Sequence, residues 1–355
     1  METIYASVKR RRKAECMLWS TPEVKQLNKE RIRKAIQANG KCTKSKISKE
    51  TGLSVATCNN TLNEMLQAGE IIKADQEEIV MGRPADRFIY NGECHHVLGV
   101  SILAASKNKI ICTVGNALGK EQETTEEQAE EITYEMVECC IAACLEKDGA
   151  IDSISVGIPG VTHHGIIERC DIATLVGVPM AAQLKERFSM DVEVRNDMDY
   201  LSLGLYYAAY SGSRNLAVAY FPEGEDAYVG CGFVINGKVL KGASRFAGEL
   251  RYVAEAYGIS LEEQKARMKA RDSFVRYVAQ FVVTIISTID PDEIILMGHG
   301  LTEEEKDAVH AGCAAIVGEE HVPGLLVEND VDGNYRKGLI RAAINRMDFP
   351  LSELL

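Results

Sequence analysis

The chain has 355 residues, 46% of them hydrophobic, which is enough for two or three domains, and its formal net charge is -12. No run of about 18 apolar residues occurs and the N-terminus has no signal-peptide core, so we expect neither a membrane span nor secretion. Eleven cysteines without Cys-x-x-Cys spacing predict a reduced, cytoplasmic protein with no metal site.

The charge is unevenly distributed along the chain. Residues 1–90 contain 17 Lys and Arg against 11 Asp and Glu, whereas the remainder contains 23 against 41. A basic front on an acidic body indicates that the first part meets a polyanion. We therefore expect three parts: a basic flexible arm at residues 1–21, a small basic domain at residues 22–92 and a body at residues 93–355.

The small basic domain has the pattern of three helices followed by a hairpin. Apolar periodicity predicts a first helix at residues 25–38. A second, at residues 44–50, is expected between a Thr43 cap and the stop signal Thr51-Gly52, and a third from the Ser54 cap to Gln67. Short strands are expected at Ile71-Ile72 and Ile79-Val80. This order is typical of a winged helix-turn-helix domain.

The third helix carries polar side chains opposite its apolar face. Asparagine amides can pair with adenine, a threonine can contact a thymine methyl group or a phosphate, and lysines suit phosphates. An arginine in a Gly-Arg-Pro turn suits a narrow minor groove. A protein-interaction module with polar outer faces is the alternative, but the basic charge favours DNA. The predicted DNA-binding residues are Ser54, Thr57, Asn59, Asn60, Asn63, Lys44, Lys46 and Arg83.

The body alternates between strand-like and helix-like segments, which predicts an α/β fold with two similar lobes and a cleft. Strands are expected at residues 97–103, 109–115, 153–158, 192–194, 216–221, 230–235 and 293–297. Helices are expected at residues 126–146, 180–188, 201–210, 261–289, 303–316 and 335–345.

Asn196-Asp197 follows one of these strands and precedes a helix. A carboxylate at a strand end and a helix N-terminus is well placed for catalysis or ligand binding. The alternative is that Asp197 only caps the next helix.

Further motifs at strand ends are Gly-rich. They are Gly157-Ile158-Pro159-Gly160, Gly230-Cys231-Gly232, Gly242-Ala243-Ser244, Ala247-Gly248-Glu249 and Gly298-His299-Gly300. Together with Val194-Arg195-Asn196-Asp197 and the front domain, these motifs resemble the transcriptional-regulator branch of the ROK family (repressor, open reading frame, kinase) over about residues 24–350. The resemblance implies an actin-like, hexokinase-type ATPase fold behind the winged helix-turn-helix domain.

The kinase motifs of that family are altered in this chain. Ser101-Ile102-Leu103-Ala104-Ala105 stands where the family's kinases have an Asp-x-Gly-x-Thr-like phosphate loop, and Asp226-Ala227-Tyr228 replaces half of the second loop. Phosphoryl transfer depends on that cradle. We therefore expect no enzyme activity and no cofactor.

The resemblance also predicts where a ligand binds. Asn196, Asp197, Glu249 and Gly160 are expected to line a sugar site. Tyr252 replaces a family histidine, no cysteine follows it, and the family's structural zinc is therefore not expected. Because Arg251 and Tyr252 are present, three alternatives stay open for this pocket: it binds a sugar, it binds a phosphorylated or acidic ligand through Arg251, or it binds no ligand.

Three functions remain open. The leading hypothesis is a DNA-binding transcriptional regulator of the repressor type, whose non-catalytic body dimerises and senses a sugar or sugar phosphate. The first alternative is a ROK-type sugar kinase that uses Asp197 as general base. The second is a regulator whose body docks a protein partner.

Overall fold

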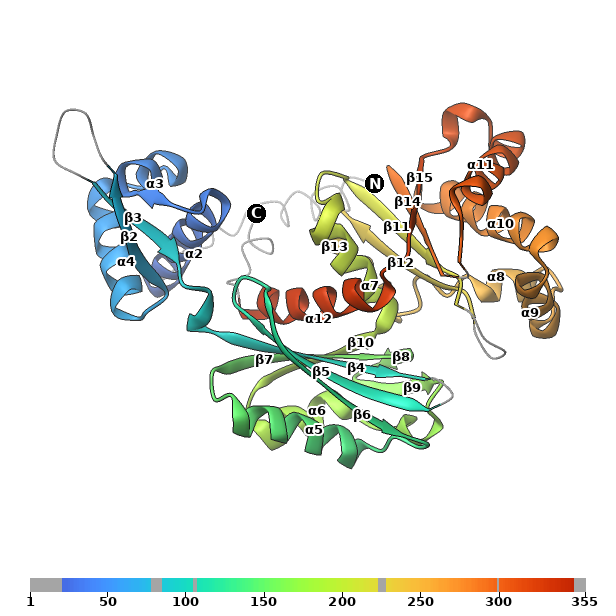
Figure 1. The fold of residues 1–355 in the computed structure, drawn as a ribbon, viewed down its shortest axis with the longest axis horizontal. Coiled ribbons are helices and arrows are strands. Elements are labelled where there is room, and N and C mark those ends of the chain that lie inside the picture. Colours follow the sequence, from blue (N-terminus) through green and yellow to red (C-terminus); the bar gives the residue numbers. More distant parts are fainter. Residues whose placement is uncertain (1–20, 78–84, 105–106, 223–227, 299, 348–355) are drawn as a thin grey trace, which may run out of the picture. The chain divides into compact units, whose positions relative to one another are not determined.

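The computed structural model describes residues 21–77, 85–104, 107–222, 228–298 and 300–347 (Figure 1). The chain divides after Cys94, and His95–Met347 forms the second compact unit. Arg83 and the Ile79-Val80 pair lie outside the described residues, as do Ala105, Asp226, Ala227 and His299.

Over the residues that the structure describes, the first unit contains three α-helices, one 3-10 helix and a three-stranded sheet. Its elements are α2 (Thr21–Asn39), β1 (Cys42–Thr43), α3 (Lys44–Thr51), α4 (Val55–Gln67), β2 (Ile71–Glu77), β3 (Ala85–Tyr90) and η1 (Gly92–Cys94), with strand order β1-β3-β2. Thr43 caps α3, Gly52 ends it with a φ of 70°, and Ser54 caps α4. These are the start and stop signals expected from the sequence.

The predicted hairpin partner of Ile71-Ile72 is wrong. The returning strand is β3, which pairs Ile71 with Tyr90 and Ile72 with Ile89. Phe88 on β3 is fully buried, and a strand at Ile79-Val80 stays a prediction because that pair lies outside the described residues.

The first lobe of the body is a five-stranded sheet of order β10-β7-β4-β5-β6. Helices α5 and α6 cover one face and α12 the other (Figure 1). The bounds are β4 (His96–Leu103), β5 (Asn108–Asn116), β6 (Glu121–Ala129), α5 (Tyr134–Lys147), β7 (Ile151–Ile158), β8 (Gly160–His163), β9 (Ile166–Cys170), η2 (Ala173–Leu175), α6 (Met180–Phe188) and β10 (Asp191–Asn196).

The second lobe is a five-stranded sheet of order β13-β12-β11-β14-β15. Alternate residues of β11 pack on opposite faces: Leu216 against α7, and Ala217 against α10. The bounds are α7 (Asp197–Leu205), η3 (a π-helical turn, Tyr206–Tyr210), β11 (Asn215–Tyr220), β12 (Gly230–Ile235), β13 (Lys238–Val239), α8 (Arg251–Ala256), α9 (Leu261–Lys269), α10 (Arg271–Ile289), β14 (Glu293–Met297), α11 (Glu303–Val317), η4 (Glu319–His321), β15 (Gly324–Glu328) and α12 (Val331–Met347).

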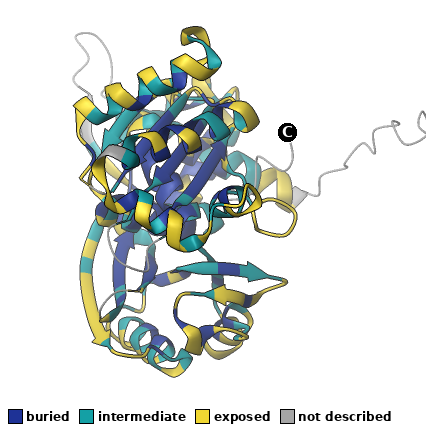
Figure 2. Cartoon of the chain, turned by 90° about the vertical axis from the view of Figure 1, so that its right-hand side faces the viewer, coloured by how far each residue is buried: buried dark blue, intermediate teal, exposed yellow. Residues whose placement is uncertain are grey.

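Burial follows these layers. Figure 2 shows buried strands beneath helices whose outer faces are exposed. Among the described residues, no single helix is long and apolar enough to cross a membrane, although α9 with Ser273–Ile289 passes the same test as a pair bent by 120°.

Two predicted helices are wrong in part. Glu126–Ala129 belongs to β6, and the helix begins only at Tyr134, after the Thr133 cap. The glutamates favour a helix, but pairing with β5 places them on an edge strand. The predicted helix over residues 261–289 breaks at Ala270 into α9 and α10. Strands β6, β8, β9, β13 and β15 and helix α8 were not predicted.

Helices α7 and α12 cross at two glycines. A Cβ atom on Gly204 would lie 1.9 Å from the Asn334 carbonyl oxygen, and one on Gly338 would lie 1.8 Å from the Tyr200 carbonyl oxygen. Because α12 also packs on β4 and β7, this crossing joins the two lobes. Small residues are required there because the two backbones nearly touch.

Candidate functional site

The junction of β10 and α7 is held by Asn196. Its Oδ1 accepts a hydrogen bond from the Met198 amide at 2.8 Å, and its Nδ2 donates to the Gly160 carbonyl at 2.9 Å. Asn196 is therefore the N-cap of α7, and Asp197 is the first helical residue rather than the cap. The side chain of Asn196 thus fixes the strand end against the start of β8.

Asp197 is partly buried beside other carboxylates. Burial raises its pKa to about 7, a hydrogen bond from the Met198 amide opposes that rise, and the charges of Asp171 and Glu249 add to it. The hydroxyl of Tyr335 on α12 is also buried and has no hydrogen-bond partner among the described residues. Burial and the neighbouring Asp197 raise the pKa of Tyr335. This junction therefore holds polar groups that the fold does not fully satisfy.

Glu249 precedes helix α8, and Tyr252 lies in its first turn. Burial raises the pKa of Glu249, although the Arg251 Nε lies 3.7 Å from its Oε2. The Arg251 guanidinium lies 4.6 Å from the ring centroid of Tyr228 and 4.8 Å from that of Tyr252, and it donates to the Tyr252 hydroxyl at 3.0 Å. Arg251 is thus oriented by two aromatic rings and a carboxylate.

Three contributors at this site were missed from the sequence. Arg169, at the end of β9, donates to the Tyr252 hydroxyl and lies 5.5 Å from its ring centroid. Asp171 acts electrostatically on Asp197 and Glu249, and its amide donates to the Pro159 carbonyl at 3.0 Å. Tyr335 comes from the C-terminal helix. The available signal was the pair of β-branched segments Val161-Thr162 and Ile166-Ile167 around His163-His164-Gly165, which is typical of a hairpin and carries Arg169.

Several glycines of the predicted motifs have a packing role. A Cβ atom on Gly160 would lie 2.1 Å from the Arg169 carbonyl oxygen, across the β8–β9 pair. One on Gly230 would lie 2.8 Å from the Met198 sulfur, and one on Gly232 would lie 2.5 Å from the Met198 carbonyl oxygen. The glycines of β12 therefore admit the start of α7, while Ser101 is buried inside β4.

The predicted DNA-binding residues occupy different environments. Asn60 and Asn63 are exposed on α4, whereas Asn59 is partly buried, with its Oδ1 inaccessible and unpaired among the described residues. Ser54 and Thr57 bond each other at 2.9 Å as part of the helix cap.

The two predicted phosphate-binding lysines also lie in different environments. Lys46 is exposed beside Glu50 (3.9 Å), and the Lys44 Nζ lies 5.8 Å from the Phe88 ring centroid. The DNA contacts predicted for both lysines remain predictions, as does that of Arg83. Among the described residues, no group of three or more His, Cys, Asp or Glu side chains is placed to hold a metal ion.

Two parts of the chain match models of known protein families. Residues 100–254 match the model of the ROK family, and residues 27–72 match that of the winged helix-turn-helix DNA-binding domain. Similar proteins include the xylose repressor of Caldicellulosiruptor bescii (23% identical over 235 residues, 64% of this chain and 58% of the relative) and that of Bacillus subtilis strain 168 (19% over 237 residues, 65% and 61%). The matches thus span about three fifths of these relatives.

Solved structures show the same fold. A ROK family transcriptional regulator, a homolog of the E. coli MLC protein, has a TM-score of 0.64 and 18% identity, over 90% of this chain and 96% of that one. The ROK hexokinase of Thermus thermophilus has a TM-score of 0.57 and 17% identity, over 71% and 99%. The expected fold class, a hexokinase-type body behind a winged helix-turn-helix domain, is therefore confirmed.

Proposed function

We propose that this chain, which carries a ROK family domain behind an N-terminal winged helix-turn-helix domain, is a DNA-binding transcriptional repressor with a sugar-sensing body. The observation that carries the proposal is α4, whose exposed face presents Asn60 and Asn63 in a basic unit of helix-turn-helix type. Two copies in a homodimer would read the two halves of a palindrome.

The proposed sensor is the site around Asp197. Asp197 and Glu249 are carboxylates that suit sugar hydroxyls, and a bound hydroxyl can donate to a carboxylate that the fold leaves under-satisfied. Xylose is the first sugar to test, because the similar curated proteins are xylose repressors. Binding would favour one placement of the paired DNA-binding domains.

DNA binding is tested by changing the exposed face of α4. In the double variant Asn60→Ala/Asn63→Ala, we expect affinity for the specific sequence to fall about 10- to 100-fold, because each lost pair of hydrogen bonds to a base removes discrimination. Fluorescence anisotropy with fragments upstream of the chain's own gene, against random DNA at fixed salt, measures this. Xylose should change the wild-type affinity and leave Asp197→Asn unaffected.

Gln37→Ala is the matched control, since it removes an exposed amide from α2 of the same unit. It should bind as the wild type does. Equal binding of specific and random DNA by the wild type would rule out the proposal.

A sugar kinase is the second candidate, and one observation favours it. The pKa of Asp197, about 7, suits a general base at neutral pH. Two observations count against a kinase. Gly230 and Gly232 serve the packing of α7. By the family resemblance, Ser101 stands where a kinase has the carboxylate of its first phosphate loop. ATP turnover with xylose or hexoses that disappears in Asp197→Asn would establish the kinase instead.

A further inference from the structure

A pocket of about 350 Å³, to whose lining Asp197 does not belong, carries five basic or imidazole side chains and one carboxylate. It is formed by the β8–β9 turn, α6 and β10 of the first lobe, by the segment after β13 of the second lobe, and by the end of α12. Its volume is in the range of small-molecule sites. The side chains that define its chemistry are His163, His164, Lys185, Glu193, Arg245 and Arg346.

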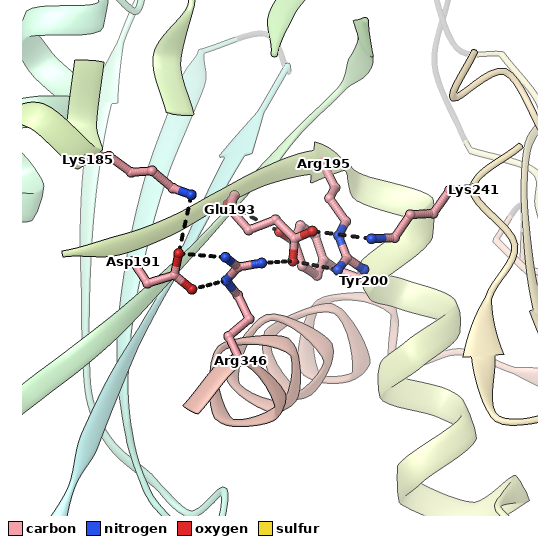
Figure 3. A network of polar contacts seen from close by, with 7 residues as sticks. All are labelled: Lys185, Asp191, Glu193, Arg195, Tyr200, Lys241 and Arg346. Carbon is pink, nitrogen blue, oxygen red and sulfur yellow. Dashed lines mark hydrogen bonds and ion pairs between the residues drawn. The ribbon is translucent and has the colours of Figure 1, made fainter. Parts of the chain in front are cut away.

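Figure 3 shows a network of ion pairs that includes three residues of the pocket lining, Lys185, Glu193 and Arg346. Arg346 binds both carboxylate oxygens of Asp191 and lies 3.3 Å from Glu193. Lys185 lies 3.3 Å from Asp191, and Lys241 lies 3.4 Å from Glu193. These carboxylates hold the cationic side chains in fixed positions before any ligand binds.

Positive charge exceeds negative charge here. Arg195 joins the network through Glu193, which makes four cations for two carboxylates, and Arg245 is a fifth cation. Asp199 is the third carboxylate nearby, and burial raises its pKa to about 6. Burial and repulsion from Arg195 and Arg245 lower the pKa of Lys241, even with Glu193 beside it.

Arg245 is the cation with spare capacity. No hydrogen bond or close ion pair joins it to the residues that the structure describes, although its charge acts on the Asp199 carboxyl and opposes the rise in the pKa of that group. Its φ of 63° places it in the left-handed region. The guanidinium donates in a fork that suits two oxygens of one anion. His163, at the end of β8, and His164, in the β8–β9 turn, add ring nitrogens to the lining.

We propose that this pocket binds a phosphate group, either as the free ion or as the monoester of a small metabolite. The phosphate would lie between Arg245 of the second lobe and the side chains of Lys185, His163 and His164 of the first lobe. Such an anion would join the two lobes, because Arg245 follows β13 whereas Lys185 belongs to α6. Phosphate binding in this pocket depends on neither DNA binding nor a sugar at Asp197. The phosphate proposal and the proposed function can therefore each fail without the other.

The probes are inorganic phosphate and glycerol 3-phosphate, titrated into the full chain by calorimetry, with sodium chloride and acetate at equal ionic strength as reference. We expect both phosphates to bind and to raise the thermal midpoint, and Arg245→Gln to weaken binding at least tenfold. Tighter binding of glycerol 3-phosphate assigns the site to a monoester, and tighter or equal binding of inorganic phosphate assigns it to the free ion.

Arg187→Gln is the matched control, because Arg187 lies on α6 near Lys185 but pairs with Glu138 at 2.9 Å outside the pocket lining. It should bind phosphate as the wild type does. Lys185→Gln provides a second test should Arg245→Gln not fold. Equal affinities in the wild type and the pocket variants, or equal stabilisation by chloride and acetate, would overturn the proposal.

Discussion

Replacing Gly338 with alanine is expected to lower the free energy of unfolding of the body by about 3 kcal/mol. The added methyl group would meet the Tyr200 carbonyl oxygen at 1.8 Å and the Tyr200 carbonyl carbon at 2.6 Å. Both atoms belong to the backbone of α7, so no side-chain rotation relieves the clash. Equilibrium urea denaturation followed by circular dichroism measures the loss.

Gly312→Ala is the control for this substitution. Gly312 also lies within a helix, α11, but its added Cβ would sit 3.5 Å from the Ala279 Cβ, an ordinary contact. This variant should be unchanged or more stable by up to about 1 kcal/mol, because alanine favours the helix. If the two variants unfold at the same urea concentration, the close crossing of α7 and α12 does not limit stability.

Replacing Asp197 with asparagine is expected to stabilise the ligand-free chain by about 2 kcal/mol at pH 8. Its pKa of about 7 in the folded state lies above the usual value of 3.8, so between about pH 4 and about pH 7 the folded chain holds a proton that the unfolded chain has released. Wild-type stability therefore falls through this group as the pH rises from about 4 to about 7. Asparagine is neutral at every pH and can still accept from the Met198 amide.

The difference between the variant and the wild type should therefore be small near pH 4, grow to pH 7 and then level off. Urea denaturation at pH 4.5, 6 and 8 measures it. Asp307→Asn, which changes an exposed carboxylate on α11, should show no such trend. A constant difference for Asp197→Asn would mean that burial does not disfavour its charge.

Much of the fold was predictable because its signals are local. The caps Thr43 and Ser54, with Gly52 between them, fixed the turn of the first unit, and β14 was placed at its observed bounds. The Glu-rich segment of β6 was misread because its strand character depends on pairing with β5. Local propensity cannot show a partner strand.

The candidate site was only half predictable for a similar reason. Asp197 and Glu249 followed from motifs, but Tyr335 reaches Asp197 from far along the chain. The sequence also did not show which polar side chains of α4 are exposed. Asn59 and Asn60 are neighbours in sequence, yet only Asn60 is exposed, because packing divides the polar face of α4.

Strand β6 has a consequence for the behaviour of the chain in concentrated solution. It is the outer strand of the first sheet among those described, and an open outer strand can recruit a strand from another molecule. Glu121, Glu123, Glu126 and Glu127 all lie on it. Two such strands brought together would set glutamate beside glutamate, so mutual repulsion at neutral pH protects this border from aggregation, and acidification removes that protection.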